Sequence, residues 1–295
     1  MGKWLNDPQV TTFEVKDKVA TITLNRPEKR NALSMQVLNE FQAALMEADD
    51  RKDIRCVVLQ GAGKDFCAGY DLGGGGGYLT TGGREFDADQ YRGNASYDDD
   101  IWQLRLRGQA RMIPFDMFKP LLCKVHGNCL AGGTDLALMC DIIIAADDAR
   151  IGFPATRALG SPANHMWLYH AGPQWAKRLL FTGDSIRGRD AAKIGLVLKS
   201  VPKEKLDAEL AHLAKRIANV EPDLLAAHKR IVNLGMELMG TRTLQRLAGE
   251  NDGRAHLSGA FDGFMKNLKE KGLKEALRIR DEPFGKGDAS VDPEV

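Results

Sequence analysis

The chain has 295 residues, of which 43% are hydrophobic and 27% are charged. This composition is ordinary for a globular protein and excludes a disordered chain. Lysine and arginine number 41, aspartate and glutamate number 40, and the formal net charge is +1. The total charge therefore gives no sign of binding to nucleic acid or to an anionic membrane surface. No apolar run approaches the roughly 18 residues of a membrane-spanning helix.

The cysteines argue against a disulfide framework. Their number is odd and no two form a C-x-x-C pair, so neither a set of disulfides nor a zinc site is indicated. The first ten residues also lack the apolar core of a signal peptide. We therefore expect a cytoplasmic protein with no structural metal and with free thiols at Cys56, Cys67, Cys123, Cys129 and Cys140.

The chain opens with a predicted pair of strands. Residues 19–24 alternate β-branched and aliphatic side chains, which is typical of a strand. We expect it to pair with residues 11–15 across the polar turn at 16–18. Pro27 then predicts a loop over residues 25–31.

Residues 34–59 predict a strand–helix–strand unit together with the strand before them. Ser34 is a suitable N-cap, and apolar residues recur at helical spacing over residues 35–45. The continuous apolar run at 56–59 predicts a strand that is buried on both faces. The order of these elements favours an α/β fold.

The same unit recurs further along the chain. We predict a strand at 121–125, a loop at 127–132, a helix at 133–139 and a second buried strand at 142–145. Between the two units, residues 73–100 contain five consecutive glycines and three consecutive aspartates, which favours a mobile loop or lid that reshapes the substrate pocket.

The second half of the chain is predicted to be mostly helical. Apolar residues keep a helical rhythm over residues 206–217 and 224–238, and residues 264–280 predict one further helix. We expect a core over residues 1–200, a C-terminal helical region over 201–284 and a disordered tail over 285–295, since that tail is polar and contains glycine and proline.

Several familiar catalytic motifs are absent. The sequence has no phosphate-binding P-loop, zinc-binding H-E-x-x-H, serine-hydrolase G-x-S-x-G or dinucleotide-binding G-x-G-x-x-G motif. Residues 65–72 and 126–135 stand out instead, because each follows a buried strand, where ligands bind in α/β folds. Gly132 and Gly133 lead directly into a helix, so their N–H groups suit an anionic oxygen. The alternative is that these glycines only permit close packing of strand and helix.

Four segments together resemble the crotonase, or enoyl-CoA hydratase/isomerase, superfamily. They are VATITLNRPEKRNAL at 19–33, FCAGYDL at 66–72, VHGNCLAGGTDLALMCD at 125–141 and LFTGDSIRGRDAAKIGLV at 180–197. The resemblance implies an α/β fold with a spiral of ββα units and a C-terminal helical subdomain. It also implies homotrimers, often paired into hexamers, acyl-CoA thioester substrates, and no metal or redox cofactor.

The resemblance further implies an oxyanion hole. Two backbone N–H groups, mapped onto Ala68 and Gly132, would hold the thioester oxygen as it becomes an enolate, which fixed dipoles do well. The neighbouring residues implied to bind substrate are Gly69, Tyr70, Asp71 and Gly133. Lys29 and Arg30 lie in a turn that resembles the family's CoA-contacting turn, where they would meet CoA phosphates. The alternative for both is a solvated basic turn.

The acid/base residues depart from the family pattern. The first carboxylate position falls on Asp135, whose side chain is shorter than glutamate and which could also be a mere N-terminal helix charge. The second position falls on Ala155, which can neither donate nor accept a proton. His165 is the preferred substitute base, and His170 and Arg157 are further candidates.

Three functions therefore remain at the level of the sequence. The favoured one is an enoyl-CoA hydratase-like lyase of fatty-acid metabolism, with Asp135 as acid/base. The second keeps the fold but changes the reaction to thioester or β-diketone hydrolysis, decarboxylation or isomerisation. The third is a noncatalytic acyl-CoA-binding subunit. His126 is expected to bond to backbone, and Trp167 and Tyr169 are expected to be packing residues.

Overall fold

The structure is a computed structural model that describes residues 2–72, 90–92 and 96–293. Most of the predicted loop or lid at 73–100 therefore lies outside the described residues. Its last part corrects the prediction, because helix α2 (Tyr97–Arg111) begins there and contains the three aspartates in its first turn. Acidic residues are favourable at a helix N-terminus, and the hydroxyl of Ser96 accepts a hydrogen bond from the N–H of Asp99 at 3.1 Å, as an N-cap does.

The larger sheet in the described chain has the strand order β1-β2-β3-β4-β6-β9. β1 is antiparallel to β2, and each later neighbour is parallel to the one before it. These strands are β1 (Thr11–Lys16), β2 (Val19–Leu24), β3 (Cys56–Gly61), β4 (Leu121–Val125), β6 (Ile142–Ala146) and β9 (Lys199–Val201). The predicted strands over 11–24, 56–59, 121–125 and 142–145 are thereby confirmed.

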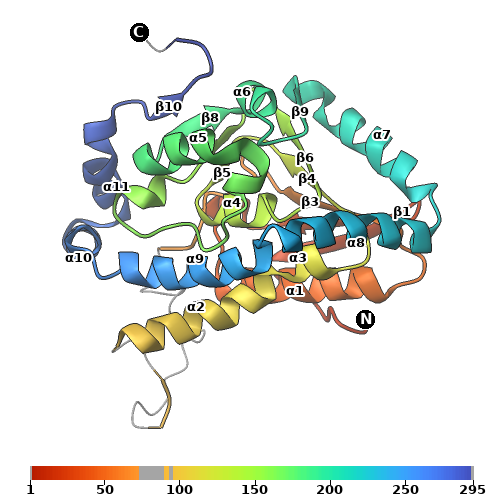
Figure 1. The fold of residues 1–295 in the computed structure, drawn as a ribbon, viewed down its shortest axis with the longest axis horizontal. Coiled ribbons are helices and arrows are strands. Elements are labelled where there is room, and N and C mark those ends of the chain that lie inside the picture. The colour runs from red at the N-terminus through yellow and green to blue at the C-terminus, as the bar shows by residue number, and fades with distance from the viewer. Residues whose placement is uncertain (1, 73–89, 93–95, 294–295) are drawn as a thin grey trace.

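Helix α1 (Met35–Asp50) confirms the first strand–helix–strand unit. The hydroxyl of Ser34 caps it by accepting the N–H of Val37 at 3.3 Å, and the side chains of Leu38 and Phe41 are buried. The helix connects β2 to the parallel strand β3. In Figure 1, α1 lies below the larger sheet and α7 (Leu206–Ala218) lies above it.

A smaller sheet has the order β10-β8-β7-β5 among the described residues. Its strands are β5 (Asn128–Leu130), β7 (Arg150–Gly152), β8 (Ser185–Arg187) and β10 (Asp288–Ala289). Two predictions are corrected here. The predicted loop at 127–132 contains β5, which pairs with β7, and the predicted disordered tail contains β10, which pairs with β8 and buries Ala289. Sequence-distant partners supply the hydrogen bonds in both cases.

The remaining helices cluster after residue 166, as predicted. They are α5 (Trp167–Thr182), α6 (Gly188–Lys193), α8 (Pro222–Leu238), α9 (Thr241–Ala255), α10 (Gly259–Lys271) and α11 (Leu273–Asp281), while α3 (Ile113–Asp116) and α4 (Gly132–Ala137) lie earlier. Short 3₁₀ turns occupy Pro27–Lys29, Pro154–Arg157, Lys203–Lys205 and Glu282–Phe284. The single helix predicted over 264–280 is wrong, because Gly272 has φ +79° and ends α10 there.

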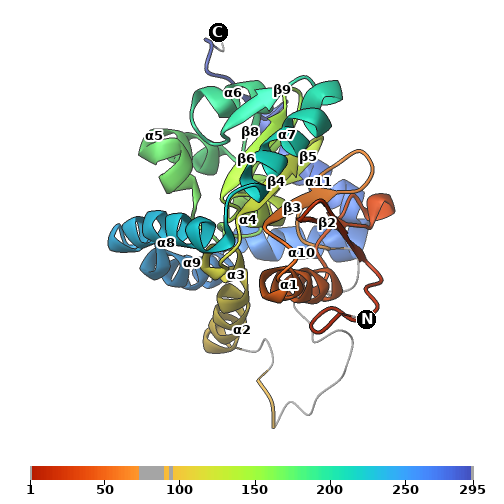
Figure 2. The same ribbon diagram turned by 90° about the vertical axis from the view of Figure 1, so that its right-hand side faces the viewer.

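Helix α2 runs beside α9 although about 140 residues separate them in the chain. Figure 1 places α2 directly below α9, and Figure 2 shows α8 and α9 stacked above α2. This pairing of α2 with the C-terminal helical region matters because a cavity lies between the two helices.

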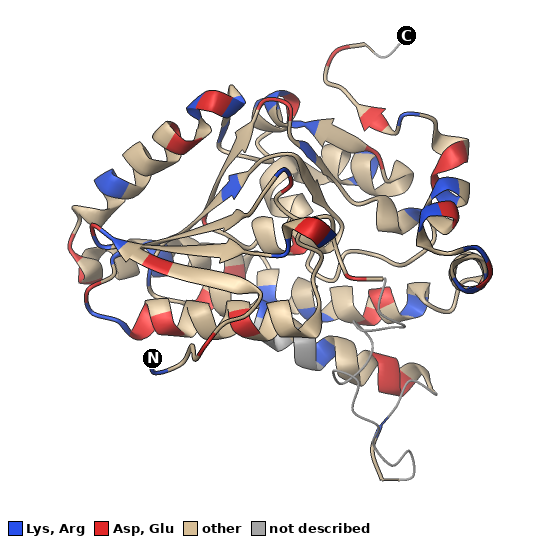
Figure 3. Ribbon diagram, turned by 180° about the vertical axis from the view of Figure 1, so that it is seen from behind, with Lys and Arg blue, Asp and Glu red and all other residues tan. Residues whose placement is uncertain are grey.

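The prediction of free thiols is confirmed, since all five cysteines are free and buried. Burial raises the pKa of the Cys56 and Cys67 thiols to about 12, so neither ionises near neutrality. Figure 3 shows basic and acidic residues interspersed along the same helices. Within the described part of the chain, no helix is both long enough and apolar enough to span a bilayer.

Candidate active site

The loops that follow β2, β3 and β4 meet at the carboxyl edge of the larger sheet. Asn31, in the first loop, adopts φ +54° and donates from its carboxamide to the backbone oxygens of Ala62 at 2.9 Å and Asp65 at 2.8 Å. The carboxylate of Asp65 in turn accepts the backbone and side-chain N–H groups of Asn128 at 2.9 and 2.7 Å. These bonds fix the three loops relative to one another.

The loop after β3 runs as an extended segment between the other two. On one side, the N–H of Leu130 donates to the carbonyl of Cys67 at 3.0 Å. On the other side, the N–H of Leu33 donates to the carbonyl of Gly69 at 2.8 Å, and the N–H of Asp71 donates to the carbonyl of Leu33 at 3.0 Å. The carbonyl of Gly69 and the N–H of Tyr70 belong to one trans peptide, so the two groups point in opposite directions. The N–H of Tyr70 is therefore directed away from Leu33.

The structure corrects the prediction for Ala68. Its N–H donates to the carbonyl of Arg30 at 3.0 Å, so this group already has a partner within the protein. Holding a thioester oxygen would require that hydrogen bond to break, and the carbonyl of Arg30 would then lose this donor.

The glycines of the two predicted loops are packed against each other. A Cβ on Gly133 would lie 2.6 Å from the carbonyl oxygen of Cys67, and one on Gly132 would lie 2.9 Å from the ring of Tyr70. Gly69 has φ +107°, and its Cβ position lies 3.5 Å from the amide nitrogen of Gly132. The packing role proposed as an alternative is thus present, and it brings the 69–70 peptide next to the first N–H of α4.

Asp135 is a buried carboxylate at this junction, with 1% of its surface exposed. The hydroxyl of Tyr70 donates to its Oδ2 at 2.6 Å. The backbone N–H of Asn164 approaches its Oδ1 at 3.4 Å, and the carboxamide of Asn164 donates to its backbone oxygen at 3.0 Å. Burial raises the pKa of Asp135 to about 6, against the lowering effects of Arg111 and of these hydrogen bonds. Asp135 is therefore not a solvated charge at the start of the helix.

Arg111 completes the chain of contacts to Asp135. Its guanidinium donates to the hydroxyl of Tyr70 at 3.3 Å and to the carbonyl of Leu104 at 3.5 Å, and the residue is 6% exposed. Sequence reasoning did not single out Arg111. The available signal was an arginine at the end of an amphipathic segment, which only becomes informative once α2 is placed beside the tyrosine.

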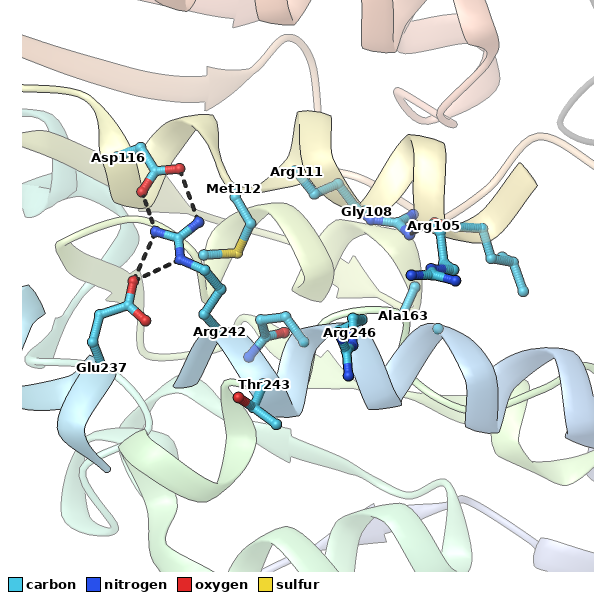
Figure 4. A pocket seen from close by; sticks show the side chains of 13 residues that line it. Arg105, Gly108, Arg111, Met112, Asp116, Ala163, Glu237, Arg242, Thr243 and Arg246 are labelled. Atoms are coloured by element: carbon cyan, nitrogen blue, oxygen red, sulfur yellow. Dashed lines mark hydrogen bonds and ion pairs between the residues drawn. The ribbon is translucent and has the colours of Figure 1, made fainter. Parts of the chain in front are cut away.

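A cavity of about 700 Å³ lies between α2 and α9, next to this centre (Figure 4). Arg111 and Ala163 line it and connect it to Asp135, because Asn164 follows Ala163 directly. The remaining lining residues are Leu104, Arg105, Gly108, Met112, Asp116, Glu237, Arg242, Thr243, Gln245, Arg246 and Gly249. A cavity of this size suits a small-molecule substrate.

The histidines predicted as substitute bases have different surroundings. The backbone N–H of His165 donates to the carboxamide oxygen of Gln245 at 2.7 Å, and burial lowers the pKa of its imidazole. His170 is bonded through Nε2 to the carbonyl of Leu138 at 2.9 Å, and burial likewise lowers its pKa. His170 is therefore a packing residue. His165 adjoins Asn164 in the chain, and its catalytic role remains a prediction.

Arg157 and Ala155 belong to the short turn at Pro154–Arg157. The guanidinium of Arg157 pairs with Asp184 at 2.9 Å and with Asp281 at 3.1 Å, so the prediction of Arg157 as an acid/base substitute is wrong. These ion pairs tie the turn to the segment between α5 and β8 and to the end of α11.

The predicted CoA-contacting residues lie at the surface. Lys29 and Arg30 are exposed, and the guanidinium of Arg30 lies 3.9 Å from Asp65. Asp71, predicted to bind substrate, forms an ion pair with Arg26 at 3.0 Å. Its carboxylate therefore holds the loops together.

Three packing predictions are confirmed. His126 is bonded through Nε2 to the carbonyl of Gly63 at 3.0 Å, and Trp167 is fully buried. Tyr169 packs against the core and donates from its hydroxyl to the carbonyl of Met239 at 3.2 Å.

A second buried carboxylate, Asp252 on α9, was not predicted. Its Oδ1 accepts the N–H of Ser161 at 2.8 Å and lies 3.7 Å from Nε2 of His256, whose Nδ1 is 2.7 Å from Asp100. Burial raises the pKa of Asp252 to about 7. Burial alone would lower the pKa of His256, but the two carboxylates outweigh it and raise that pKa. The cluster connects α2, α9 and the loop that leads to Asn164.

Comparisons with known proteins agree with this architecture. The family model described as enoyl-CoA hydratase/isomerase matches residues 14–252. The chain is 32% identical over 231 residues to a short-chain-enoyl-CoA hydratase of Clostridium acetobutylicum, covering 76% of this chain and 81% of that one. It is 31% identical over 236 residues to a probable mitochondrial enoyl-CoA hydratase of Dictyostelium discoideum, covering 77% and 76%.

Solved structures give the same result. A crystal structure of an enoyl-CoA hydratase from Mycobacterium smegmatis superposes with a TM-score of 0.84 at 36% identity, covering 94% of each chain. An enoyl-CoA hydratase/isomerase from Xanthobacter autotrophicus Py2 superposes with a TM-score of 0.84 at 31% identity, covering 94% of this chain and 99% of that one. The chain belongs to the enoyl-CoA hydratase/isomerase family of the crotonase superfamily, and the crotonase fold predicted from its motifs is confirmed.

Proposed function

We propose that the protein is an enoyl-CoA hydratase-like lyase that adds water to an α,β-unsaturated acyl-CoA. The observation that carries this proposal is the buried carboxylate of Asp135, which lies beside the Tyr70–Gly132 contact and has a pKa of about 6. A general acid/base works best when its pKa lies near the working pH. Family membership supports the acyl-CoA substrate.

The proposed oxyanion hole consists of the backbone N–H groups of Gly132 and Tyr70. Gly132 is the first residue of α4, so its N–H has no partner within the helix. Tyr70 replaces Ala68 in this role because the N–H of Ala68 is bonded to Arg30, whereas that of Tyr70 is directed away from Leu33. Fixed dipoles of this kind stabilise the enolate oxygen without reorganising during the reaction.

Asp135 is proposed to carry both proton transfers. As the carboxylate, it removes a proton from water while the water oxygen bonds to C3 of the enoyl group and the thioester becomes an enolate. The protonated Asp135 then returns the proton to C2, the enolate collapses to the thioester, and the carboxylate is regenerated. This one-carboxylate scheme is motivated by Ala155, which cannot take part in proton transfer.

Coenzyme A enters as part of the substrate in this proposal, and no separate cofactor is required. Lys29 and Arg30 are the proposed partners of its phosphates, and this is supported by their exposure on the loop that bonds to the site loops through Asn31. Guanidinium and ammonium groups pair well with phosphate oxygens.

We also propose that the chain assembles as a homotrimer or a pair of trimers through its C-terminal helices. Helix α8 presents apolar side chains to solvent, with Ile231 63%, Leu234 54% and Leu238 84% exposed. Contiguous exposed apolar residues mark interaction surfaces. Assembly through α8 would bury them.

The test of the proposed reaction is the hydration of crotonyl-CoA, followed by the loss of absorbance of the conjugated thioester and by detection of the 3-hydroxyacyl product. Asp135→Asn is expected to lower kcat by about 10²–10⁴-fold while leaving the affinity for CoA unchanged. Asp207→Asn is the matched control, since its carboxylate is exposed and pairs with Lys124 at the surface.

Two results would contradict the proposed reaction or the proposed role of Asp135. Turnover that survives in Asp135→Asn would remove Asp135 from the mechanism. Binding of acyl-CoA without hydration in the native protein would favour another thioester reaction, such as hydrolysis, decarboxylation or isomerisation, or a noncatalytic binding subunit. A panel of thioesters and β-diketones separates these alternatives.

A further inference from the structure

The cavity between α2 and α9 is lined by arginines on both sides. Arg105 and Arg111 lie on the face of α2 that includes Gly108, and Arg242 and Arg246 lie one turn apart on α9. Figure 4 shows these side chains around the space between the two helices. A cavity for a plain hydrocarbon chain would be lined mainly by aliphatic side chains.

The positive charge of this lining is only partly balanced. Arg242 pairs with Asp116 at 2.5 Å and with Glu237 at 2.7 Å, so its charge is compensated within the protein. Arg105 and Arg246, in contrast, form no ion pair or hydrogen bond with any residue that the structure describes. Both side chains are exposed, so two solvated guanidinium groups lie along the open lining of the cavity with no carboxylate partner among the described residues.

The consequence for a bound acyl group follows from desolvation. A neutral hydrocarbon chain in this cavity would displace water from the guanidinium groups of Arg105 and Arg246 and offer nothing in return, which is costly. A carboxylate would replace that water with charge-assisted hydrogen bonds, which guanidinium groups form in bidentate geometry. The lining therefore selects for an anionic ligand.

The position of the cavity indicates which part of the substrate it meets. It reaches Asp135 through Arg111, whose guanidinium contacts the hydroxyl of Tyr70, and through Ala163, which precedes Asn164. A thioester held beside Gly132 would thus direct its acyl chain between α2 and α9. The CoA phosphates would lie at the other end of the ligand, near Lys29.

We propose that the substrate is a dicarboxylic acyl-CoA, and that Arg105 and Arg246 bind the carboxylate at the far end of its acyl chain. This inference rests on the proposed function and specifies the substrate class of that site. It concerns binding of the acyl group, so it is testable apart from the hydration step.

The binding test compares adipyl-CoA with hexanoyl-CoA by isothermal titration calorimetry. Both thioesters have six-carbon saturated acyl chains, so neither can be hydrated, and they differ only in the terminal carboxylate. The native protein is expected to bind adipyl-CoA at least tenfold more tightly. The double variant Arg105→Gln/Arg246→Gln is expected to lose this preference while keeping its affinity for hexanoyl-CoA, which also verifies that it folds. Arg254→Gln, an exposed arginine of α9 outside the cavity, should retain the preference.

Two outcomes overturn the inference. Equal affinity of the native protein for both thioesters would show that the arginines do not recognise an acyl carboxylate. An equal loss of affinity for both thioesters in the double variant would show that the arginines bind the phosphates of CoA.

A parallel assay with trans-2-hexenedioyl-CoA and trans-2-hexenoyl-CoA separates this inference from the proposed reaction. If adipyl-CoA is preferred but neither unsaturated thioester is hydrated, the proposed function fails and the binding inference stands. If both are hydrated with equal kcat/KM, the reaction stands and the inference fails.

Discussion

The contact between Tyr70 and Asp135 offers a direct test of how the protein sets the pKa of its proposed acid/base. Tyr70→Phe removes only the hydroxyl that donates to Asp135 at 2.6 Å and keeps the ring that packs on Gly132. The remaining contacts of the Asp135 carboxylate are the long hydrogen bond from Asn164 and the charge of Arg111. Burial then acts against the ionised form with less opposition, so the pKa of Asp135 is expected to rise.

The size of the rise follows from the strength of the lost bond. A hydrogen bond to a charged group contributes about 1.5–3 kcal/mol, and 1.36 kcal/mol corresponds to one pKa unit. The pKa of Asp135 should therefore move from about 6 to roughly 7–8 in the variant. Because the carboxylate is the form that removes a proton from water, activity rises with pH through this pKa, and the variant should need a higher pH to reach its plateau.

The assay is the pH dependence of kcat/KM for hydration, with crotonyl-CoA or trans-2-hexenedioyl-CoA as substrate, between pH 5 and pH 9. The native profile should rise around pH 6, and the Tyr70→Phe profile should rise roughly one to two pH units higher. Tyr169→Phe is the matched control, since its hydroxyl donates to the carbonyl of Met239 and not to Asp135. An inflection that stays at the native pH in Tyr70→Phe would refute the argument that this hydrogen bond tunes Asp135.

Three further predictions concern stability and assembly. Burial raises the pKa of Asp252 to about 7, so between about pH 4 and pH 7 this carboxyl ionises in the unfolded chain while it stays protonated in the native state. Its contribution to the free energy of unfolding therefore falls over that window, and Asp252→Asn should gain roughly 3 kcal/mol relative to the native chain. Urea titrations of both proteins at the two pH values test this, and a stability difference that is the same at both would contradict it. Gly133→Ala should destabilise the protein by about 1–3 kcal/mol, because its Cβ would lie 2.6 Å from the backbone oxygen of Cys67. A melting temperature equal to that of the native protein would contradict this. Ile231→Glu should produce monomers in light scattering, since it places a charge on the exposed apolar face of α8; an unchanged mass would exclude this face from the assembly.

Much of the fold was readable from local patterns. The alternation over 19–24, the buried run at 56–59 and the N-cap at Ser34 each predict an element that the structure contains. Such patterns work because helix and strand periodicities depend on residues close together in the chain. Elements whose stability depends on distant partners were missed. β10 forms only because it pairs with β8, and β5 only because it pairs with β7.

The candidate site likewise has features that the sequence alone indicates and features that depend on the tertiary structure. The sequence by itself determined the family and the two glycine-containing loops, and it singled out Asp135 and Ala155 as the positions on which the proposed proton transfers depend. Only the tertiary structure decided that the N–H of Ala68 is already bonded to Arg30 and that the hydroxyl of Tyr70 reaches Asp135.

The arginine-lined cavity is the clearest case of what sequence reasoning could not reach. Arg105 and Arg246 are exposed charged residues on two helices, and in each helix taken alone they have no evident role. Their meaning depends on α2 packing beside α9, from a distant part of the chain. Hydrogen-bond direction, burial and charge compensation are properties of groups brought together in space. A linear pattern specifies which groups are available, and the packing of distant segments decides which of them meet.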